Sequence, residues 1–268
     1  MESKFLKKNI ENAKGIKNKF DIEGKVSLVI GGNKGIGQAI AIGFAAAGAD
    51  VCVVGRGPEG LQETKDAICS FGRKGSFISA DVTKEENVIR VVDEVLEHYK
   101  KIDILVNSQG AGILGETPSF ALENWEKVMD VNLKSVFLLC KYAGIQMLAQ
   151  KSGKIINISS VRGFQGRAND SAYAPSKGAV NQLTRSLAIE WGKLGINVNA
   201  LAPATTLTEM SEKVLSQKEY RDWVLSRLPM DRLVELDDII GPAVFLASKA
   251  SDFINGHIIP IDGGWLSA

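Results

Sequence analysis

The chain has 268 residues, of which 45% are hydrophobic and 24% charged, and its formal net charge is +1. This composition is typical of a globular protein with enough apolar side chains to form a sizeable core. A net charge this small creates no electrostatic field that would attract nucleic acid or an anionic membrane. We therefore expect the partners to be small molecules or further copies of the chain.

The first 20 residues carry six lysines interspersed with acidic residues, which predicts a solvated N-terminal arm. The start of the chain has no apolar run of signal-peptide length, and nowhere are there 18 consecutive apolar residues, so we expect a cytoplasmic protein. His98 and His257 have no acidic or cysteine partner at ligand spacing, and we expect no metal site.

Short runs rich in valine and isoleucine alternate with longer stretches of helical period. The predicted strands are 25–30, 50–54, 76–79, 102–107, 154–158, 197–202 and 258–261. The predicted helices are 36–47, 59–71, 84–99, 121–150, 171–194 and 237–248. This alternation predicts an α/β fold, a doubly wound parallel sheet of the Rossmann type with helices on both faces. The rhythm breaks at 203–237, where two short helices should replace a strand and form a substrate lid near 204–236.

A glycine-rich turn with the spacing GxxxGxG joins the first predicted strand to the first helix. Its glycines permit a tight turn and close backbone approach, and the helix N-terminus presents free N–H groups to a pyrophosphate. Such turns also occur for structural reasons alone, but the place between strand and helix favours dinucleotide binding. The residues assigned to this site are Gly31, Asn33, Lys34, Gly35, Ile36 and Gly37.

The end of the second predicted strand bears on the choice of cofactor. A carboxylate here would hold the ribose 2′-hydroxyl of NAD, whereas a cation would hold the 2′-phosphate of NADP. The chain has Gly55 followed by Arg56 at this point, and Lys34 lies inside the glycine turn. We therefore favour NADP(H) over NAD(H). NAD(H) is the alternative, because both cations could be solvated surface residues.

Tyr173 and Lys177 lie four residues apart near the start of a predicted helix, on one helical face. To act near neutrality, a phenol with a pKa of ~10 must lose about three pKa units, which corresponds to ~4 kcal/mol. One ammonium at ~4 Å supplies about that amount at an effective dielectric constant of ~20. We therefore expect Lys177 to make Tyr173 a proton donor and acceptor. Ser160, at the end of the preceding strand, would supply a neutral donor to a carbonyl oxygen.

These motifs, in their order and spacing, resemble the pattern of the short-chain dehydrogenase/reductase family. The resemblance implies that residues 21–268 form one dinucleotide-binding catalytic domain. It also implies that Tyr173 exchanges the proton, that Lys177 lowers its pKa and binds the nicotinamide ribose, and that Ser160 polarises the substrate oxygen. The other residues so implied are Asn132 for a water of the proton relay, Asp81 for adenine, Thr208 for the nicotinamide amide, and Val82, Asn107, Gly110, Pro203 and Thr206 for the cofactor in general.

Three positions beside the expected cofactor depart from the family pattern. Ile30 stands in place of threonine, the run Asn107-Ser-Gln-Gly110 replaces Asn-Asn-Ala-Gly, and Ala204 replaces a glycine. Each could alter cofactor affinity, and Ala204 lacks the freedom of glycine to take a positive φ. A cofactor-binding regulator without turnover is therefore an alternative, but none of the departures removes a catalytic side chain, which favours an enzyme.

The C-terminal run Asn255–Leu266 resembles the sugar-acid and polyol branch of the family, which includes gluconate and deoxygluconate dehydrogenases. Arg162 and Arg167 follow the catalytic serine and could pair with a substrate carboxylate. The residues assigned to the substrate are Ser160, Arg162, Arg167 and Tyr173. The alternatives are solvated loop arginines and, for the reaction, reduction of a 3-oxoacyl thioester by the same catalytic residues.

The family resemblance also implies a homotetramer. The predicted helices 121–150 and 171–194 carry more apolar residues than packing against one face of the sheet requires. This favours an interface between copies of the chain, and packing within the core is the alternative. The residues concerned are Ala143, Ile145, Met147, Leu148, Leu183, Leu187 and Trp191.

Overall fold

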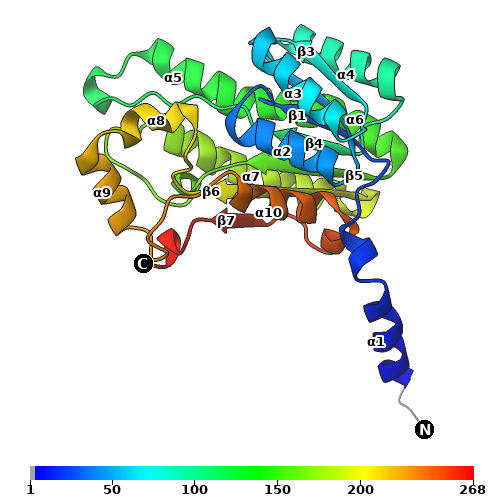
Figure 1. Cartoon of the computed structure of the whole chain (residues 1–268). Helices are drawn as coiled ribbons and strands as arrows, with labels where there is room; N and C mark the ends of the chain where they lie inside the picture. Colours follow the sequence, from blue (N-terminus) through cyan, green and yellow to red (C-terminus); the bar gives the residue numbers. More distant parts are fainter. Residues whose placement is uncertain (1–3) are drawn as a thin grey trace.

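The computed structural model describes residues 4–268 and shows a parallel sheet between two layers of helices (Figure 1). The strands are β1 Val26–Ile30, β2 Asp50–Gly55, β3 Gly75–Ser79, β4 Ile104–Asn107, β5 Gly153–Ile158, β6 Ile196–Pro203 and β7 Ile258–Ile261. Their order in the sheet is β3-β2-β1-β4-β5-β6-β7, and every neighbouring pair is parallel. The predicted doubly wound α/β sheet is confirmed, with each predicted strand present.

Two hydrophobic layers hold the helices against the sheet. The main helices are α2 Gly35–Ala46, α3 Pro58–Ser70, α4 Glu85–Tyr99, α5 Leu122–Met129, α6 Ser135–Gln150, α7 Tyr173–Trp191 and α10 Asp237–Ala247. One layer packs α4, α6 and α7 on the sheet, and the other packs α2, α3 and α10. All side chains of β1 are buried, and neighbours such as Leu28 and Val29 belong to opposite layers. Burial on both faces explains why the strands read as continuous apolar runs.

The strand order reverses beside β1, with β2 and β3 on one side and β4 to β7 on the other. Ligands of such sheets bind at the carboxyl ends of the strands near this reversal. The turns that follow β1, β2, β4, β5 and β6 therefore meet at the edge expected to hold a ligand. The two short helices predicted after β6 are present as α8 Glu209–Leu215 and α9 Lys218–Ser226.

The helix predicted over residues 121–150 is interrupted. Residues Asp130–Lys134 form a π-helical turn between α5 and α6, and the hydroxyl of Ser135, the first residue of α6, donates a hydrogen bond to the Val131 carbonyl at 2.7 Å. A π-turn widens the helix locally without ending it, so the apolar period continues on both sides and the sequence does not show the change. The turn carries the fully buried Asn132 toward the loop after β4.

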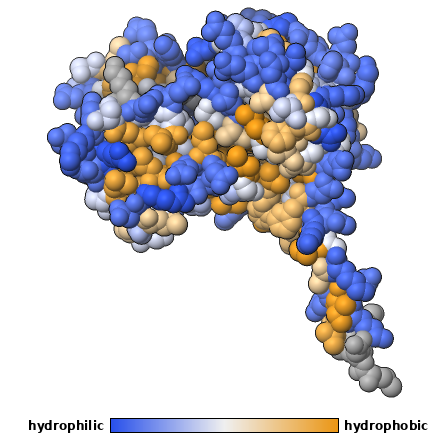
Figure 2. Space-filling view, in the orientation of Figure 1, coloured by the Kyte–Doolittle hydropathy of each residue, from blue (hydrophilic) through white to orange (hydrophobic). Residues whose placement is uncertain are grey.

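The N-terminal segment forms a helix, α1 Lys4–Lys14, that projects from the body of the protein (Figure 1). The side chains of Lys7, Lys8, Glu11 and Lys14 are exposed, and the helical structure of this segment was not expected. Leu6 and Ile10 are exposed apolar residues of this helix. Figure 2 shows apolar surface along it. Residues 1–3 of the predicted arm lie outside the described residues. Within residues 4–268, no helix is long and apolar enough to cross a membrane.

Most of the apolar residues thought to form an interface between copies belong to the core. Ala143 and Met147 are fully buried, and Leu187 and Trp191 pack in the same layer. The reason is that α6 and α7 lie against each other, with Gly144 making room for the Trp191 ring: a Cβ on Gly144 would lie 2.7 Å from its Cη2. The large apolar side chains that α6 and α7 expose are Phe137, Ile145 and Ile189.

Candidate active site

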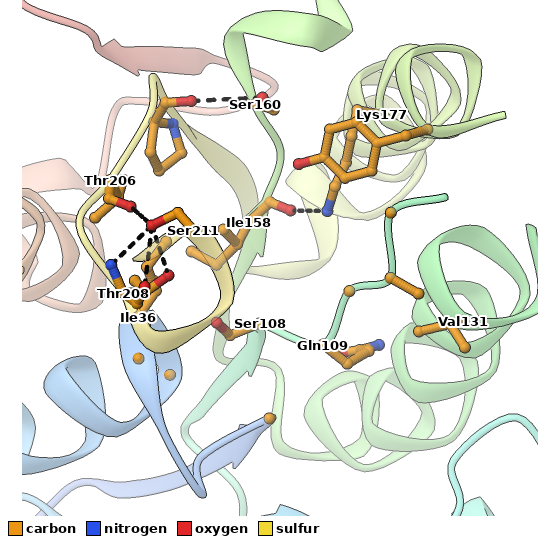
Figure 3. Close-up of a pocket in the computed structure, with 18 of the residues that line it drawn as sticks. Ile36, Ser108, Gln109, Val131, Ile158, Ser160, Lys177, Thr206, Thr208 and Ser211 are labelled. Atoms are coloured by element: carbon orange, nitrogen blue, oxygen red, sulfur yellow. Dashed lines mark hydrogen bonds between the residues drawn. The ribbon is translucent and has the colours of Figure 1, made fainter. Parts of the chain in front are cut away.

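A cavity of about 690 Å³ lies at the carboxyl edge of the sheet, between the glycine turn and the segment that carries α8 and α9. All residues assigned to the site from the sequence line it except Asn107 and Asn132. In Figure 3, Ser160 and Lys177 lie at one end of the cavity and Ile36 lies beside the glycine turn at the other. The described residues contain no group of three or more histidine, cysteine or acidic side chains that could hold a metal ion.

The turn between β1 and α2 fits a phosphate. Gly31 has a φ of 75°, and a Cβ on Gly37 would lie 2.2 Å from the Gly31 carbonyl oxygen, so a larger residue does not fit there. The N-cap residue of α2, Lys34, forms no side-chain capping hydrogen bond. The first N–H groups of a helix lack intrahelical partners and carry the positive end of its dipole. The close backbone and the uncapped helix start therefore suit the pyrophosphate of a dinucleotide.

The end of the cavity at β2 and β3 carries two basic side chains, Lys34 and Arg56. Among the described residues Arg56 forms no salt bridge, whereas Lys34 is paired with Glu209 at 3.3 Å. The Asp81 carboxylate accepts hydrogen bonds from the N–H and the hydroxyl of Thr83. Burial alone would raise the pKa of Asp81, but these bonds and the Arg56 charge lower it. Asp81 is thus anionic at neutral pH, and Arg56 is the cation free to meet a phosphate.

The start of α7 brings Tyr173 and Lys177 beside Ser160, which follows β5. The Lys177 Nζ donates a hydrogen bond to the Ile158 carbonyl at 2.8 Å and lies 5.7 Å from the centre of the Tyr173 ring. The Ser160 Oγ accepts a hydrogen bond from the N–H of Arg162 at 3.1 Å. A strand end and a helix start thus gather a phenol, an ammonium and a hydroxyl at one end of the cavity.

Burial governs the ionisation of the phenol and the ammonium. It raises the pKa of Tyr173, an effect that the Ser160 hydroxyl reduces in part. It also lowers the pKa of Lys177 to about 8. The net lowering of the Tyr173 pKa that the sequence led us to expect is not found in this structure, because desolvation of the phenol is the largest effect on that pKa. Tyr173 is therefore a neutral phenol at pH 7, able to donate a proton.

A buried carboxylate that no sequence motif marked fixes the start of α7. Asp170 accepts hydrogen bonds from the backbone N–H groups of Tyr173 and Ala174, at 3.1 and 3.2 Å. Its other oxygen lies 3.4 Å from the guanidinium of Arg167. An aspartate just before a helix can accept hydrogen bonds from the first N–H groups of that helix. The position of Asp170, three residues before Tyr173, could therefore have indicated this cap in the sequence. Arg167 lines the cavity, but its charge is already compensated by Asp170.

Two assigned asparagines lie behind the cavity wall. The Asn132 Oδ1 accepts from the Ala111 N–H at 2.7 Å, and its amide donates to the Ala111 carbonyl and the Ser176 hydroxyl, both at 2.9 Å. The Asn107 amide donates to the Asn157 Oδ1 at 2.8 Å, from β4 to β5. Buried amides need such protein partners. Asn107 therefore does not line the cavity and its assignment to the cofactor stays a prediction, while the Asn132 side chain positions the loop after β4.

The departures from the family pattern are accommodated without backbone strain. Ile30 is buried in the core, and the Gln109 amide donates to the Ser135 hydroxyl at 2.7 Å. Ala204 does not take a positive φ, and its N–H donates to the Ile261 carbonyl at 3.0 Å. The backbone at Ala204 therefore does not need the freedom of a glycine.

Thr206 and Thr208 border the cavity after β6, together with Ser211, which the sequence motifs did not include (Figure 3). The Ser211 hydroxyl donates to the Thr206 carbonyl at 2.6 Å and accepts from the Thr208 N–H at 3.0 Å. Thr208 is the N-cap of α8 in a capping box with Ser211, and the spacing of the two residues signals this cap in the sequence. These bonds fix where α8 begins beside the cavity.

Comparisons with known proteins find a family model and relatives that match almost the whole chain. A family model described as enoyl-(acyl carrier protein) reductase matches residues 30–266. The chain is 43% identical over 248 residues to 2-dehydro-3-deoxy-D-gluconate 5-dehydrogenase of Bacillus subtilis, covering 92% of this chain and 97% of that one. It is 36% identical to gluconate 5-dehydrogenase of Gluconobacter oxydans, over 91% and 96% of the two chains. The structure of a gluconate 5-dehydrogenase from Burkholderia cenocepacia, in complex with NADP and tartrate, matches with a TM-score of 0.90 and 35% identity, over 93% and 98% of the two chains.

Proposed function

The chain belongs to the short-chain dehydrogenase/reductase family, and on that premise we propose that it transfers a hydride between NADP(H) and the secondary alcohol or ketone of a sugar acid. The observation that carries the proposal is the convergence of Ser160, Tyr173 and Lys177 at one end of a cavity whose other end is the glycine turn. An acid as substrate is supported by the relatives named 2-dehydro-3-deoxy-D-gluconate 5-dehydrogenase and gluconate 5-dehydrogenase, and by the solved gluconate 5-dehydrogenase in complex with NADP and tartrate.

Tyr173 and Ser160 act on the substrate oxygen in this proposal. When bound, the dinucleotide supplies the nicotinamide carbon that exchanges the hydride. In reduction the neutral phenol of Tyr173 donates its proton to the oxygen, and in oxidation the phenolate accepts the proton of the alcohol. The Ser160 hydroxyl donates a hydrogen bond that stabilises negative charge on this oxygen. Lys177, whose pKa is about 8, is mostly protonated at pH 7 and stabilises the phenolate through its charge.

Residues 21–268 act in this proposal as one catalytic domain, with residues 204–236 as its lid. The lid segment contributes Thr208 and Tyr220 to the cavity wall. Its two ends are held together, because Thr206 forms a β-bridge with Val234. A segment anchored at both ends can close over a substrate as a unit. The three cysteines of the chain are free, which suits the reducing cytoplasm in which we place the reaction.

An assay of the purified chain with NADP⁺ or NADPH tests the proposed function. The panel should contain sugar acids, their keto acids and 3-oxoacyl thioesters. We expect turnover with at least one sugar acid or its keto acid at a higher kcat/KM than with any thioester. A preference for the thioesters would replace the proposal with acyl reduction. Tight NADPH binding without turnover of any compound would point to a cofactor-binding regulator instead.

NADPH should bind more tightly than NADH, and Arg56→Ala should narrow that preference by roughly tenfold or more, because a charge-assisted hydrogen bond to the 2′-phosphate is lost. Lys34→Ala should have a smaller effect, since Lys34 is already paired with Glu209. Equilibrium titration of nicotinamide fluorescence measures both affinities. Arg90→Ala is the control, because Arg90 pairs with Glu94 outside the cavity. A clear preference of the unmodified chain for NADH would contradict the assignment of NADP(H) as its cofactor.

We also propose a homotetramer, and light scattering at micromolar concentration should report a mass about four times that of the chain. Exposed apolar side chains on α6 and α7 support an interface: Ile145 is 50% and Ile189 83% exposed. Burying such a side chain stabilises by ~1.5–3 kcal/mol, so the double change Ile145→Glu and Ile189→Glu should shift the protein toward smaller species. Phe71→Glu, at a similarly exposed apolar residue after α3, should not. A stable monomer would contradict the assembly.

A further inference from the structure

Arg162 carries an uncompensated charge in the cavity wall. Its N–H bonds to the Ser160 Oγ, so its side chain leaves the short helical turn Val161–Gly163 directly after the catalytic serine. Among the described residues its guanidinium forms one side-chain hydrogen bond, to the Gly166 carbonyl at 3.4 Å, and no salt bridge. A guanidinium has five N–H donors, so most of them remain available to a ligand.

Two tryptophans hold this guanidinium in place, and we call them the aromatic clasp. The Arg162 Cζ lies 5.4 Å from the ring centre of Trp265 and 6.0 Å from that of Trp223. Trp223 belongs to α9 in the lid segment, whereas Trp265 is buried near the C-terminal end, and the two rings meet edge to face at 5.7 Å. Cation–π contacts orient the guanidinium without using its N–H donors. The aromatic clasp therefore leaves the N–H donors of Arg162 available to a ligand in the cavity, and it connects Arg162 to the lid through Trp223.

The surroundings of Arg162 leave its charge unbalanced. Arg167 is paired with Asp170, while the Cζ of Arg227 lies 5.5 Å from the centre of the same Trp265 ring and adds a further positive charge. Burial and the positive charges of Arg167 and Arg227 lower the pKa of Arg162, and Tyr220 and Asp170 offset part of this effect. Because a guanidinium stays protonated in proteins, an anion is the ligand that would compensate this cation.

We propose that Arg162 binds the carboxylate of the substrate with paired N–H donors, and that the aromatic clasp couples this contact to the lid. The inference rests on the proposed function and names the group that makes the substrate an acid. Since Arg162 lies two positions beyond Ser160, a carboxylate a few carbons from the reacting alcohol can reach it while that alcohol faces Ser160 and Tyr173. A polyol with –CH₂OH in place of the carboxylate lacks the charge-assisted pair, so Arg162 selects acids over polyols.

The kinetic test compares the sugar acid that the chain turns over best with the polyol in which –CH₂OH replaces the carboxylate. Arg162→Met should lower kcat/KM for the acid by roughly tenfold or more and change that for the polyol by less than about threefold. Arg162→Lys keeps the charge without the planar fork and should lose part of the acid preference, which keeps the test available if the methionine variant does not fold. Arg221→Met, an exposed arginine of α9 outside the cavity, should change neither value. Equal losses for both substrates, or none for the acid, would overturn the proposal.

A binding measurement separates this inference from the proposed function. Tryptophan fluorescence of the unmodified chain should change saturably with D-gluconate and not with D-glucitol, because the carboxylate would contact the guanidinium held by Trp223 and Trp265. The response should disappear in Arg162→Met and persist in Arg221→Met. If no sugar acid is turned over, the proposed function fails, and this titration then tests the carboxylate site alone. A gluconate response that survives Arg162→Met would refute the site.

Discussion

Replacing Tyr173 with phenylalanine should lower kcat for a sugar acid by ~10²–10⁴-fold while NADPH affinity stays nearly unchanged. The phenol is the group that exchanges the proton in the proposed reaction, and a positioned acid or base contributes about this much. Phenylalanine keeps the aromatic ring that lies 5.7 Å from the Lys177 ammonium, and Asp170 still accepts from the backbone N–H at this position. Steady-state turnover and titration of nicotinamide fluorescence measure the two quantities.

Tyr142→Phe is the matched control for this change. Tyr142 lies outside the cavity, and its hydroxyl bonds to the exposed Glu85. Loss of that hydroxyl should leave turnover and NADPH affinity as they are. Near-normal turnover of the Tyr173→Phe variant with a good substrate would show that another group supplies the proton.

The strands could be predicted from the sequence because their apolar runs are short, rich in β-branched residues and bounded by turns. The predicted strand 258–261 coincides with β7, and the predicted strand 197–202 falls within β6 Ile196–Pro203. The π-turn at Asp130–Lys134 could not be predicted, because the same apolar period runs through α5 and α6 on either side of it. Nor does a pattern of mixed charge distinguish a solvated helix such as α1 from an irregular arm.

The chemistry-bearing residues of the site could be placed because strand ends and helix starts of a doubly wound sheet meet at one edge. Their side-chain partners could not. Arg162 and Arg167 look alike in the sequence, and only the folded chain sets Asp170 against Arg167 and the aromatic clasp against Arg162. The burial of the phenol could not be predicted from the sequence either. The spacing of Tyr173 and Lys177 indicated a lowered phenol pKa, whereas desolvation raises that pKa.

Replacing Lys177 with methionine should weaken NADPH binding as well as turnover, in contrast to the Tyr173→Phe variant. The change removes the charge that stabilises the phenolate and the ammonium proposed to bind the nicotinamide ribose. It also leaves the Ile158 carbonyl without its donor at 2.8 Å. We expect a loss of turnover of ~10²-fold or more and a loss of NADPH affinity of roughly tenfold, since charged hydrogen bonds contribute ~1.5–3 kcal/mol. Unchanged NADPH affinity would contradict the ribose contact.

The stability of the Lys177→Met variant should depend on pH differently from that of the unmodified chain. The pKa of Lys177 is about 8 in the folded protein, below the ~10.4 of an unfolded lysine. Between these values the unfolded chain binds more protons than the folded one, so this lysine destabilises the fold most at pH 7 and progressively less up to about pH 10.4. Methionine removes that dependence. The Tm of the unmodified chain minus that of the variant should therefore become more positive between pH 7 and pH 10, as differential scanning calorimetry would measure, and a difference that stayed flat would show that the ammonium is not desolvated in the fold.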